Sequence, residues 1–177
     1  MKSIQDIELM GDNVKSKLRS CGDNVRIYPM AKIAFPHVVD LSDHCRIRDF
    51  VFIFAGEGVK IGQYTDIQPH VVFWGGGETI IGDRVSVGPG TVLLSAVYSH
   101  AKGLKMVDGL PEGSTKALYG KLIIEDDVYI GANCTLMPEI TIGEGAIIGA
   151  SSFVNKDVEP WGIYVGSPAK KISERKK

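Results

Sequence analysis

The stretch IEDDVYIGANCTLMPEITIGEGAIIGASSFVNKDV, residues 124–158, repeats with a period of six. Aliphatic side chains occupy the first position of each repeat: Ile124, Ile130, Leu136, Ile142, Ile148 and Val154. Small or aliphatic residues follow four positions later: Val128, Cys134, Ile140, Ala146, Ser152 and Val158. A helix places apolar residues three and four apart, and a flat strand places them two apart. A period of six therefore predicts a short strand and a tight corner, repeated around a triangular coil.

Glycines come directly after three of these aliphatic residues, at Gly131, Gly143 and Gly149. Glycine adopts positive φ at little cost, so we expect these residues to turn the corners of the coil in that conformation.

The same spacing extends through the N-terminal half in sets of three. The sets are Leu41, Ile47 and Ile53; Ile61, Ile67 and Phe73; and Ile81, Val87 and Leu93, with Cys21, Ile27 and Ile33 extending the register backwards. The step is six within a set and eight between sets, so the N-terminal coils have twenty residues and the C-terminal coils eighteen. The aliphatic side chains should point inward and stack on their equivalents one coil away, which gives a continuous core.

Composition indicates one globular domain whose net charge does not favour binding to a highly charged partner. A chain of 177 residues can bury one core, and 44% apolar residues are typical of soluble proteins. A net charge of −1 gives no field that favours nucleic acid or an anionic membrane. The three cysteines lack the spacing of a disulfide framework or a zinc site. This cysteine usage fits a reducing, cytoplasmic setting. The acidic N-terminal residues do not resemble a signal peptide, and no apolar run is long enough to cross a bilayer.

The repeat is interrupted once, after Leu93. The segment LSAVYSH (residues 94–100) leads into residues 101–122, which carry no period and contain several glycines. Long irregular insertions in a compact fold are usually functional or disordered. His100 immediately precedes this loop, so we expect the reactive site at this point of the chain.

The register places two aromatic residues at the corner from which this loop leaves. Phe54 and Trp74 occupy the position of Leu94 in the preceding coils, and each begins a two-residue expansion of the repeat. We expect a wide ledge beside His100, with Glu57 and Glu78 nearby. An aromatic face and a carboxylate suit a sugar ring and its hydroxyl groups, although the aromatic residues also suit a filled corner or a subunit contact. The acceptor contacts expected there are Phe54, Trp74, Tyr98 and Glu78.

Six consecutive repeats and the ending VGSPAK (residues 165–170) resemble the hexapeptide-repeat acyltransferases, most closely the galactoside, maltose and xenobiotic acetyltransferases. The resemblance covers about residues 21–170. It implies an all-β fold, a left-handed parallel β-helix with one extruded loop and a short C-terminal helix. The implied organisation is a capping segment over residues 1–20, the β-helix over 21–166 with its loop at 101–122, and a tail or short helix over 167–177.

His100 matches the catalytic histidine of the galactoside-type enzymes in spacing and in its place before the loop. Acyl transfer needs a base that takes the acceptor's proton, and histidine suits this because its pKa lies near the working pH. His37, His44 and His70 lie on coil faces or corners. A carbonic-anhydrase class with the same solenoid uses three histidine ligands, but its close H-x4-H pair is missing here, so we expect no metal.

The resemblance also implies an acetyl-CoA site in the groove between neighbouring solenoids. The matching positions are Ala132, Ala150, Tyr129, Ser167, Lys170 and Lys171, with Arg175 as a further cation for a coenzyme A phosphate. Small residues let backbone groups approach the pantetheine arm, although corner geometry alone also explains the alanines. The Asn that the galactoside-type enzymes carry before the histidine has no match in WGGGETI (residues 74–80).

The leading hypothesis is an acetyl-CoA-dependent O- or N-acetyltransferase acting on a sugar, a sugar nucleotide or a surface polysaccharide precursor. Transfer would be direct, with His100 as the general base. The alternatives are acetylation of an antibiotic or other xenobiotic, and a non-catalytic solenoid that scaffolds partners. The resemblance further implies a homotrimer with active sites between subunits.

Overall fold

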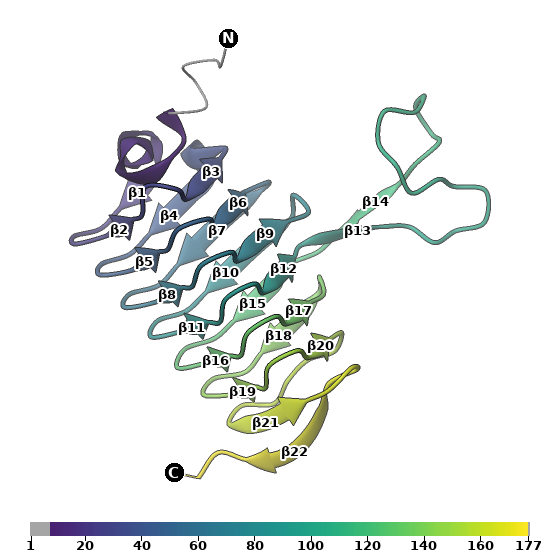
Figure 1. Cartoon of the computed structure of the whole chain (residues 1–177). Coiled ribbons are helices and arrows are strands. Elements are labelled where there is room, and N and C mark those ends of the chain that lie inside the picture. The colour runs from purple at the N-terminus through teal and green to yellow at the C-terminus, as the bar shows by residue number, and fades with distance from the viewer. Residues whose placement is uncertain (1–7, 177) are drawn as a thin grey trace.

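The computed structural model describes residues 8–176. Residues 1–7 of the expected capping segment and Lys177 lie outside the described residues. The chain winds through three parallel sheets that form the sides of a triangular prism, and Figure 1 shows the coils stacked along one axis with a hairpin projecting from the stack. We number the sheets in the order in which each coil passes through them.

Sheet 1 contains β1 (Ser20–Cys21), β4 (Val39–Leu41), β7 (Gly58–Ile61), β10 (Glu78–Ile81), β15 (Leu122–Ile124) and β18 (Ile140–Ile142). Sheet 2 contains β2 (Arg26–Ile27), β5 (Arg46–Ile47), β8 (Asp66–Ile67), β11 (Ser86–Val87), β16 (Tyr129–Ile130), β19 (Ile147–Ile148), β21 (Gly162–Val165) and β22 (Lys170–Glu174). Sheet 3 contains β3 (Lys32–Ala34), β6 (Phe52–Phe54), β9 (Val72–Trp74), β12 (Val92–Leu94), β17 (Thr135–Leu136) and β20 (Phe153–Val154).

The predicted core ladders are confirmed by the strand register. In sheet 2, Ile27 lies against Ile47, Ile47 against Ile67, and the column continues through Val87, Ile130 and Ile148. Sheets 1 and 3 carry equivalent columns, and nearly all of these side chains are fully buried. Burial of each such side chain stabilises the fold by about 1.5–3 kcal/mol. The period of six is therefore the spacing that returns one inward side chain to each sheet per coil.

The expected conformation of the corner glycines is wrong for Gly131, Gly143 and Gly149, which do not have positive φ. Their role is close approach instead: a Cβ on Gly131 would lie 2.5 Å from the backbone nitrogen of Ala150 in the next coil. Positive φ occurs at other corner positions, and most residues that adopt it have side chains, as at His44 and Tyr64. These glycines are thus required by packing between coils.

The N-terminal end of the stack is covered by η1 (Gly11–Lys17), a 3-10 helix that lies over the first coil in Figure 1. Val14 on this helix is fully buried in the core. The Gly11 N–H donates to the Ala31 carbonyl, and the Arg19 N–H donates to the Val39 carbonyl. A second short helix, η2 (Pro36–Val38), lies between β3 and β4.

The predicted C-terminal helix is wrong, because residues 170–174 form β22, which runs antiparallel to β21. The last strand of sheet 2 would otherwise leave its backbone groups unpaired, and the tail folds back to pair with this edge. No helix among residues 8–176 is long and apolar enough to span a bilayer.

Candidate active site

An antiparallel hairpin leaves the prism at the corner between sheets 3 and 1, at the predicted break in the repeat. Its stem pairs β13 (Ala96–Tyr98) with β14 (Ala117–Tyr119), and the Ser99 N–H extends the pairing to the Lys116 carbonyl at 2.8 Å. Figure 1 shows the stem and its loop pointing away from the coils. The insertion is thus shorter in its irregular part than the expected 101–122, because residues 117–119 belong to the stem and Leu122 begins β15.

The glycines of the WGGGE expansion let the hairpin start this close to the coil. A Cβ on Gly75, where φ is +128°, would lie 2.3 Å from the Ala96 nitrogen. A Cβ on Gly77 would lie 2.3 Å from the Gly120 carbonyl oxygen. The glycines of this expansion therefore let the backbone of the coil pack directly against both ends of the hairpin stem.

A cavity of about 420 Å³ lies where the hairpin meets the coils. Its aromatic walls are Phe54, Trp74, Tyr98 and Tyr119. The rings of Phe54 and Trp74 lie 5.1 Å apart between centroids, and Trp74 leaves 51% of its surface exposed. The structure thus brings together three of the four predicted acceptor contacts, namely Phe54, Trp74 and Tyr98.

Among residues 8–176, the carboxylate that borders this cavity is Asp108 from the hairpin loop. The Tyr98 hydroxyl group hydrogen-bonds to Asp108, and this bond, with burial and the carboxylate charge, raises the pKa of Tyr98 above its ordinary value. Sequence reasoning missed Asp108 and Tyr119, because both lie in the insertion, where no period assigns a residue to a face.

The predicted carboxylates of the ledge are not at the cavity. Glu78 lies on β10 and pairs with Lys121 at 3.0 Å and with Lys60 at 3.6 Å. The hydrogen bond from Lys121 and the two positive charges lower the pKa of Glu78. Glu57 is exposed and does not line the cavity. Asp108 therefore lies where Glu78 was expected, next to the aromatic rings.

His100 lies two residues beyond the end of β13, at the start of the loop. Its side chain is exposed, and it forms no hydrogen bond or ion pair with residues 8–176. It does not line the cavity of Trp74 and Tyr98. Within one chain, the ring of His100 is therefore open to a molecule or a neighbouring copy that approaches the hairpin.

The other histidines are part of aromatic contacts along the corners. His44 stacks on Tyr64 with centroids 4.7 Å apart, and His70 stacks on Phe50 at 4.8 Å. His37 makes an edge contact with Phe35 at 6.4 Å. Among residues 8–176, no three His, Cys, Asp or Glu side chains come together as a metal-binding group.

Ala132 and Ala150 occupy equivalent positions in successive coils at the corner between sheets 2 and 3. The Ser151 N–H donates to the Ala132 carbonyl at 2.8 Å, which holds the two turns together. Both alanines are at the surface, and Tyr129 on the neighbouring strand is 50% exposed. The structure therefore brings three of the six predicted coenzyme A contacts to one edge of the prism.

The remaining predicted coenzyme A residues lie at the C-terminal end, and one of them is already paired. Lys171 binds Glu159 at 2.7 Å and Glu174 at 2.8 Å, and these hydrogen bonds raise its pKa well above the ordinary value. Arg175 donates to backbone carbonyls of the last coils and lies over the Trp161 ring. Ser167 and Lys170 are exposed, and Lys170 makes no ion pair with residues 8–176.

Comparison with known proteins agrees with this architecture. A family model for the bacterial transferase hexapeptide (six repeats) matches residues 121–156. The dTDP-4-amino-4,6-dideoxy-D-glucose acyltransferase of Escherichia coli is 31% identical over 160 residues, which cover 90% of this chain and 83% of that protein. A probable macrolide acetyltransferase of Lysinibacillus sphaericus is 36% identical over 122 residues, which cover 69% of this chain and 63% of that protein.

A solved structure extends the similarity over the whole fold. AntD, an N-acyltransferase from Bacillus cereus in complex with dTDP and 3-hydroxybutyryl-CoA, superposes with a TM-score of 0.86 at 32% identity. The match covers 92% of this chain and 86% of AntD. Stacked coils, one extruded hairpin and this degree of identity lead to one conclusion: the chain belongs to the hexapeptide-repeat acyltransferases and is an acyltransferase.

Proposed function

We propose that the chain transfers an acetyl group from acetyl-CoA to the amino group of a nucleotide-linked sugar. The observation that carries this proposal is the relative that covers 90% of the chain, whose name specifies a dTDP-linked amino sugar as its substrate. AntD, which is similar over 92% of the chain, binds dTDP together with an acyl-CoA. Among the predicted acceptors, the sugar nucleotide is therefore favoured, and N-acylation is favoured over O-acylation.

The aromatic cavity is the proposed site of the sugar ring. Its volume of about 420 Å³ suits a monosaccharide held on flat rings, here those of Phe54 and Trp74. Asp108 offers carboxylate oxygens to hydroxyl or amino hydrogens of the sugar, and Tyr98 orients that carboxylate through its hydroxyl group. These residues together supply an apolar face and a polar acceptor of hydrogen bonds.

His100 is the proposed general base. The amino nitrogen of the sugar attacks the thioester carbonyl, and His100 takes the proton that nitrogen loses as the new C–N bond forms. The tetrahedral intermediate then expels the coenzyme A sulfur as a thiolate, which takes up a proton. A backbone N–H is the expected partner of the oxyanion. The exposed, unpaired imidazole at the start of the loop supports this role.

Coenzyme A is proposed to lie along the edge that carries Ala132 and Ala150, with Tyr129 beside it. The small side chains leave the backbone of these turns open to hydrogen bonding with the pantetheine arm. Ser167 and Lys170 lie beyond them toward the C-terminus, where the nucleotide end of the coenzyme would extend. Lys170 is the cation better suited to a phosphate, because two glutamates already hold Lys171.

We further propose a homotrimer whose active sites lie between copies. The outward side of sheet 3 carries half-buried apolar residues in register, Phe52, Val72 and Val92, and the column continues through Thr135 to Phe153. Apolar patches of this kind mark protein contacts. If sheet 3 of each copy faces a three-fold axis, its two edges meet the neighbouring copies. One of those edges carries the hairpin with His100, and the other carries Ala132 and Ala150.

The proposed setting is the cytoplasm, in the synthesis of a surface polysaccharide. All three cysteines, Cys21, Cys45 and Cys134, are free thiols. Free thiols are typical of reducing compartments, where acyl-CoA and sugar nucleotides are also available. An amino sugar acylated at the nucleotide stage is a building block for such a polymer.

An acceptor panel tests the function. The protein is mixed with acetyl-CoA and, separately, dTDP-4-amino-4,6-dideoxyglucose, its 4-hydroxy analogue, chloramphenicol and a macrolide, and release of free thiol is measured. The expected result is turnover with the amino sugar nucleotide, with mass spectrometry showing one added acetyl group. Turnover only with an antibiotic would replace this proposal by the xenobiotic alternative, and no turnover with any acceptor would favour a scaffold.

Replacement of His100 by Ala tests the mechanism. The expected loss in kcat is about 10²–10⁴-fold, because a positioned base contributes that much to the rate. His37→Ala is the matched control, since His37 does not line the cavity and should leave kcat unchanged. An unchanged kcat in His100→Ala would remove His100 from the reaction.

A further inference from the structure

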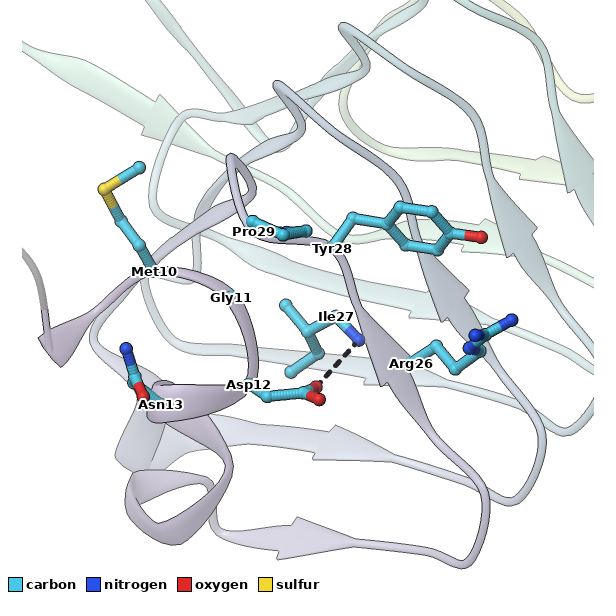
Figure 2. Close-up of a pocket in the computed structure, with 8 residues that line it drawn as sticks. All are labelled: Met10, Gly11, Asp12, Asn13, Arg26, Ile27, Tyr28 and Pro29. Carbon is cyan, nitrogen blue, oxygen red and sulfur yellow. Dashed lines mark hydrogen bonds between the residues drawn. The ribbon is translucent and has the colours of Figure 1, made fainter.

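Besides the aromatic cavity at the hairpin, a polar hollow lies on sheet 2 of the first coils, away from the hairpin of the same chain. It consists of two cavities of about 620 and 600 Å³, and Arg26 lines both. Figure 2 shows the first cavity, between η1 and residues 26–29. The second adds Arg46, His44 and Tyr64 from the following coils. None of these residues takes part in the acyl transfer described above.

The hollow carries two arginines that form no ion pair with any carboxylate among the described residues. Arg26 and Arg46 are directly opposite in the register of β2 and β5, and like charges in this position are destabilising. Neither arginine forms an ion pair with residues 8–176. Two carboxylates line these cavities, Asp12 in the first and Asp66, opposite Arg46 in the register, in the second. Each already has a cationic partner, Asp66 in Arg48 at 2.7 and 2.9 Å and Asp12 in Lys15 at 2.8 Å.

Asp12 lies near Arg26 but does not pair with it. Its carboxylate accepts a hydrogen bond from the Ile27 N–H at 3.2 Å, shown as the dashed line in Figure 2. The side chains of Arg26 and Tyr28 extend away from it in the same view. The Asp12 charge acts on Arg26 through space without an ion pair, so the guanidinium group remains available to another anion.

Flat rings surround the two arginines. The Tyr28 ring has the guanidinium groups of Arg26 and Arg48 at 5.9 and 5.5 Å from its centroid. Tyr64 is stacked on His44 and leaves 60% of its surface exposed. Paired guanidinium groups bind phosphate oxygens, and exposed aromatic rings stack on bases. This combination of groups fits a nucleoside diphosphate.

We propose that Arg26 and Arg46 bind the diphosphate of the nucleotide half of the acceptor, and that Tyr64 and Tyr28 flank its nucleoside. The inference rests on the proposed function, and it assigns the part of the substrate that the aromatic cavity is too small to hold. In one chain the two hollows lie on different sides of the prism. A single acceptor therefore reaches both only across the interface between two copies.

The proposed trimer provides this arrangement. When sheet 3 of each copy faces the axis, the hairpin corner of one copy meets the corner between sheets 2 and 3 of the next. Sheet 2 of that next copy then faces the groove beside the hairpin. Arg46 belongs to the same coil as Phe54, and Trp74 belongs to the following coil. Coils are about 4.8 Å apart along the axis. Arg46 and Trp74 therefore differ in height by one coil, a distance that one sugar ring can span.

Donor and acceptor would thus approach His100 from opposite ends of one groove. The acceptor lies along the N-terminal coils, through Arg26 and Arg46. The donor lies along the C-terminal coils, past Ala132 and Ala150. The hairpin stands between these two sets of coils, because it leaves the chain between β12 and β15.

Binding of thymidine diphosphate, measured by isothermal titration calorimetry, tests the arginine site directly. The wild-type protein should bind it, and the double variant Arg26→Gln/Arg46→Gln should bind at least about tenfold more weakly, because each lost charge-assisted bond weakens binding by about that factor. Arg19→Gln is the matched control, since Arg19 is already paired with Asp40 on sheet 1. Absence of binding by the wild-type protein, or equal binding by the double variant, would overturn the proposal.

Kinetics separate this inference from the proposed function. In the double variant, the KM for the sugar nucleotide should rise about tenfold or more while the KM for acetyl-CoA stays unchanged. Turnover with an unchanged KM would leave the proposed function intact and refute the arginine site. Binding of thymidine diphosphate that depends on the arginines, without acyl transfer, would support the site and refute the proposed function.

Mixed trimers test the placement between copies. Chains with His100→Ala are unfolded and refolded together with chains carrying Arg26→Gln/Arg46→Gln, and activity is measured at a low acceptor concentration. Mixed trimers contain interfaces where the hairpin of one chain faces the intact arginines of the other, so activity should exceed that of either variant alone. Activity no higher than the sum of the separate variants would place both groups in one copy and contradict the arrangement.

Discussion

Gly131→Ala is a direct test of how tightly the coils are stacked. The added Cβ would lie 2.5 Å from the Ala150 nitrogen and 2.8 Å from its Cα, whereas ordinary contacts begin at 3.4 Å. Relief of this clash requires the coils to separate by about 0.9 Å. That opening would lengthen the 2.8 Å bond from the Gly131 N–H to the Ile148 carbonyl beyond the usual limit of about 3.2 Å.

The expected cost combines two effects. Overpacking costs about 1–3 kcal/mol, and a weakened buried ladder bond costs about 1 kcal/mol more. A chain of this size loses about 2–4 °C of Tm per kcal/mol, so Gly131→Ala should lower Tm by about 5–15 °C. Thermal unfolding followed by circular dichroism, at one fixed protein concentration, measures this change.

Gly109→Ala is the matched control for Gly131→Ala. Gly109 has φ of +81° in the hairpin loop, but nothing lies within 4 Å of its added Cβ. Its cost is the backbone strain of a side chain at positive φ, about 1–2 kcal/mol, and it is confined to the loop. If Gly131→Ala melts at the wild-type temperature, or no lower than Gly109→Ala, close packing at this corner is not what excludes a side chain.

Further changes test the core, the acceptor site and the ion pairs. Ile130→Ala, at a fully buried position in the sheet 2 ladder, should destabilise the fold by about 2–5 kcal/mol in urea unfolding. Trp74→Ala should raise the KM for the acceptor about tenfold and leave the KM for acetyl-CoA unchanged; equal changes in both would argue against a sugar platform. Arg84 holds the pKa of Asp127 below its ordinary value of 3.8. That pair contributes stability above pH 3.8 that is lost as the pH falls through the lowered pKa. Asp127→Asn should therefore lower Tm slightly at pH 7, by about 2 °C or less. It should also make Tm less dependent on pH below about 4. If the fall of Tm with acid is the same in the variant, the Arg84–Asp127 pair does not contribute to it.

Sequence reasoning assigned the candidate acceptor site to one corner of the prism. Phe54 and Trp74 were assigned to the hairpin corner by the count of residues per coil alone, because a regular repeat relates sequence distance to position in space. Tyr98 was placed correctly because it is still within reach of the last regular strand. Asp108 was not found, because its place depends on how a loop without a period folds back onto Tyr98. Glu78 was placed wrongly beside the aromatic rings because its partner Lys121 lies 43 residues away in sequence.

The sequence by itself determined the stack of coils, the residues that face its core and the point where it is interrupted. It could do so because each aliphatic side chain packs on its equivalent one coil away, so the core depends on a local spacing that repeats. The tertiary structure decided the paired stem of the hairpin, the strand β22 in place of a helix, and the close packing that excludes a side chain at Gly131. Each of these depends on which backbone edge or neighbouring coil lies within a few ångströms, and a period in the sequence carries no information about that distance.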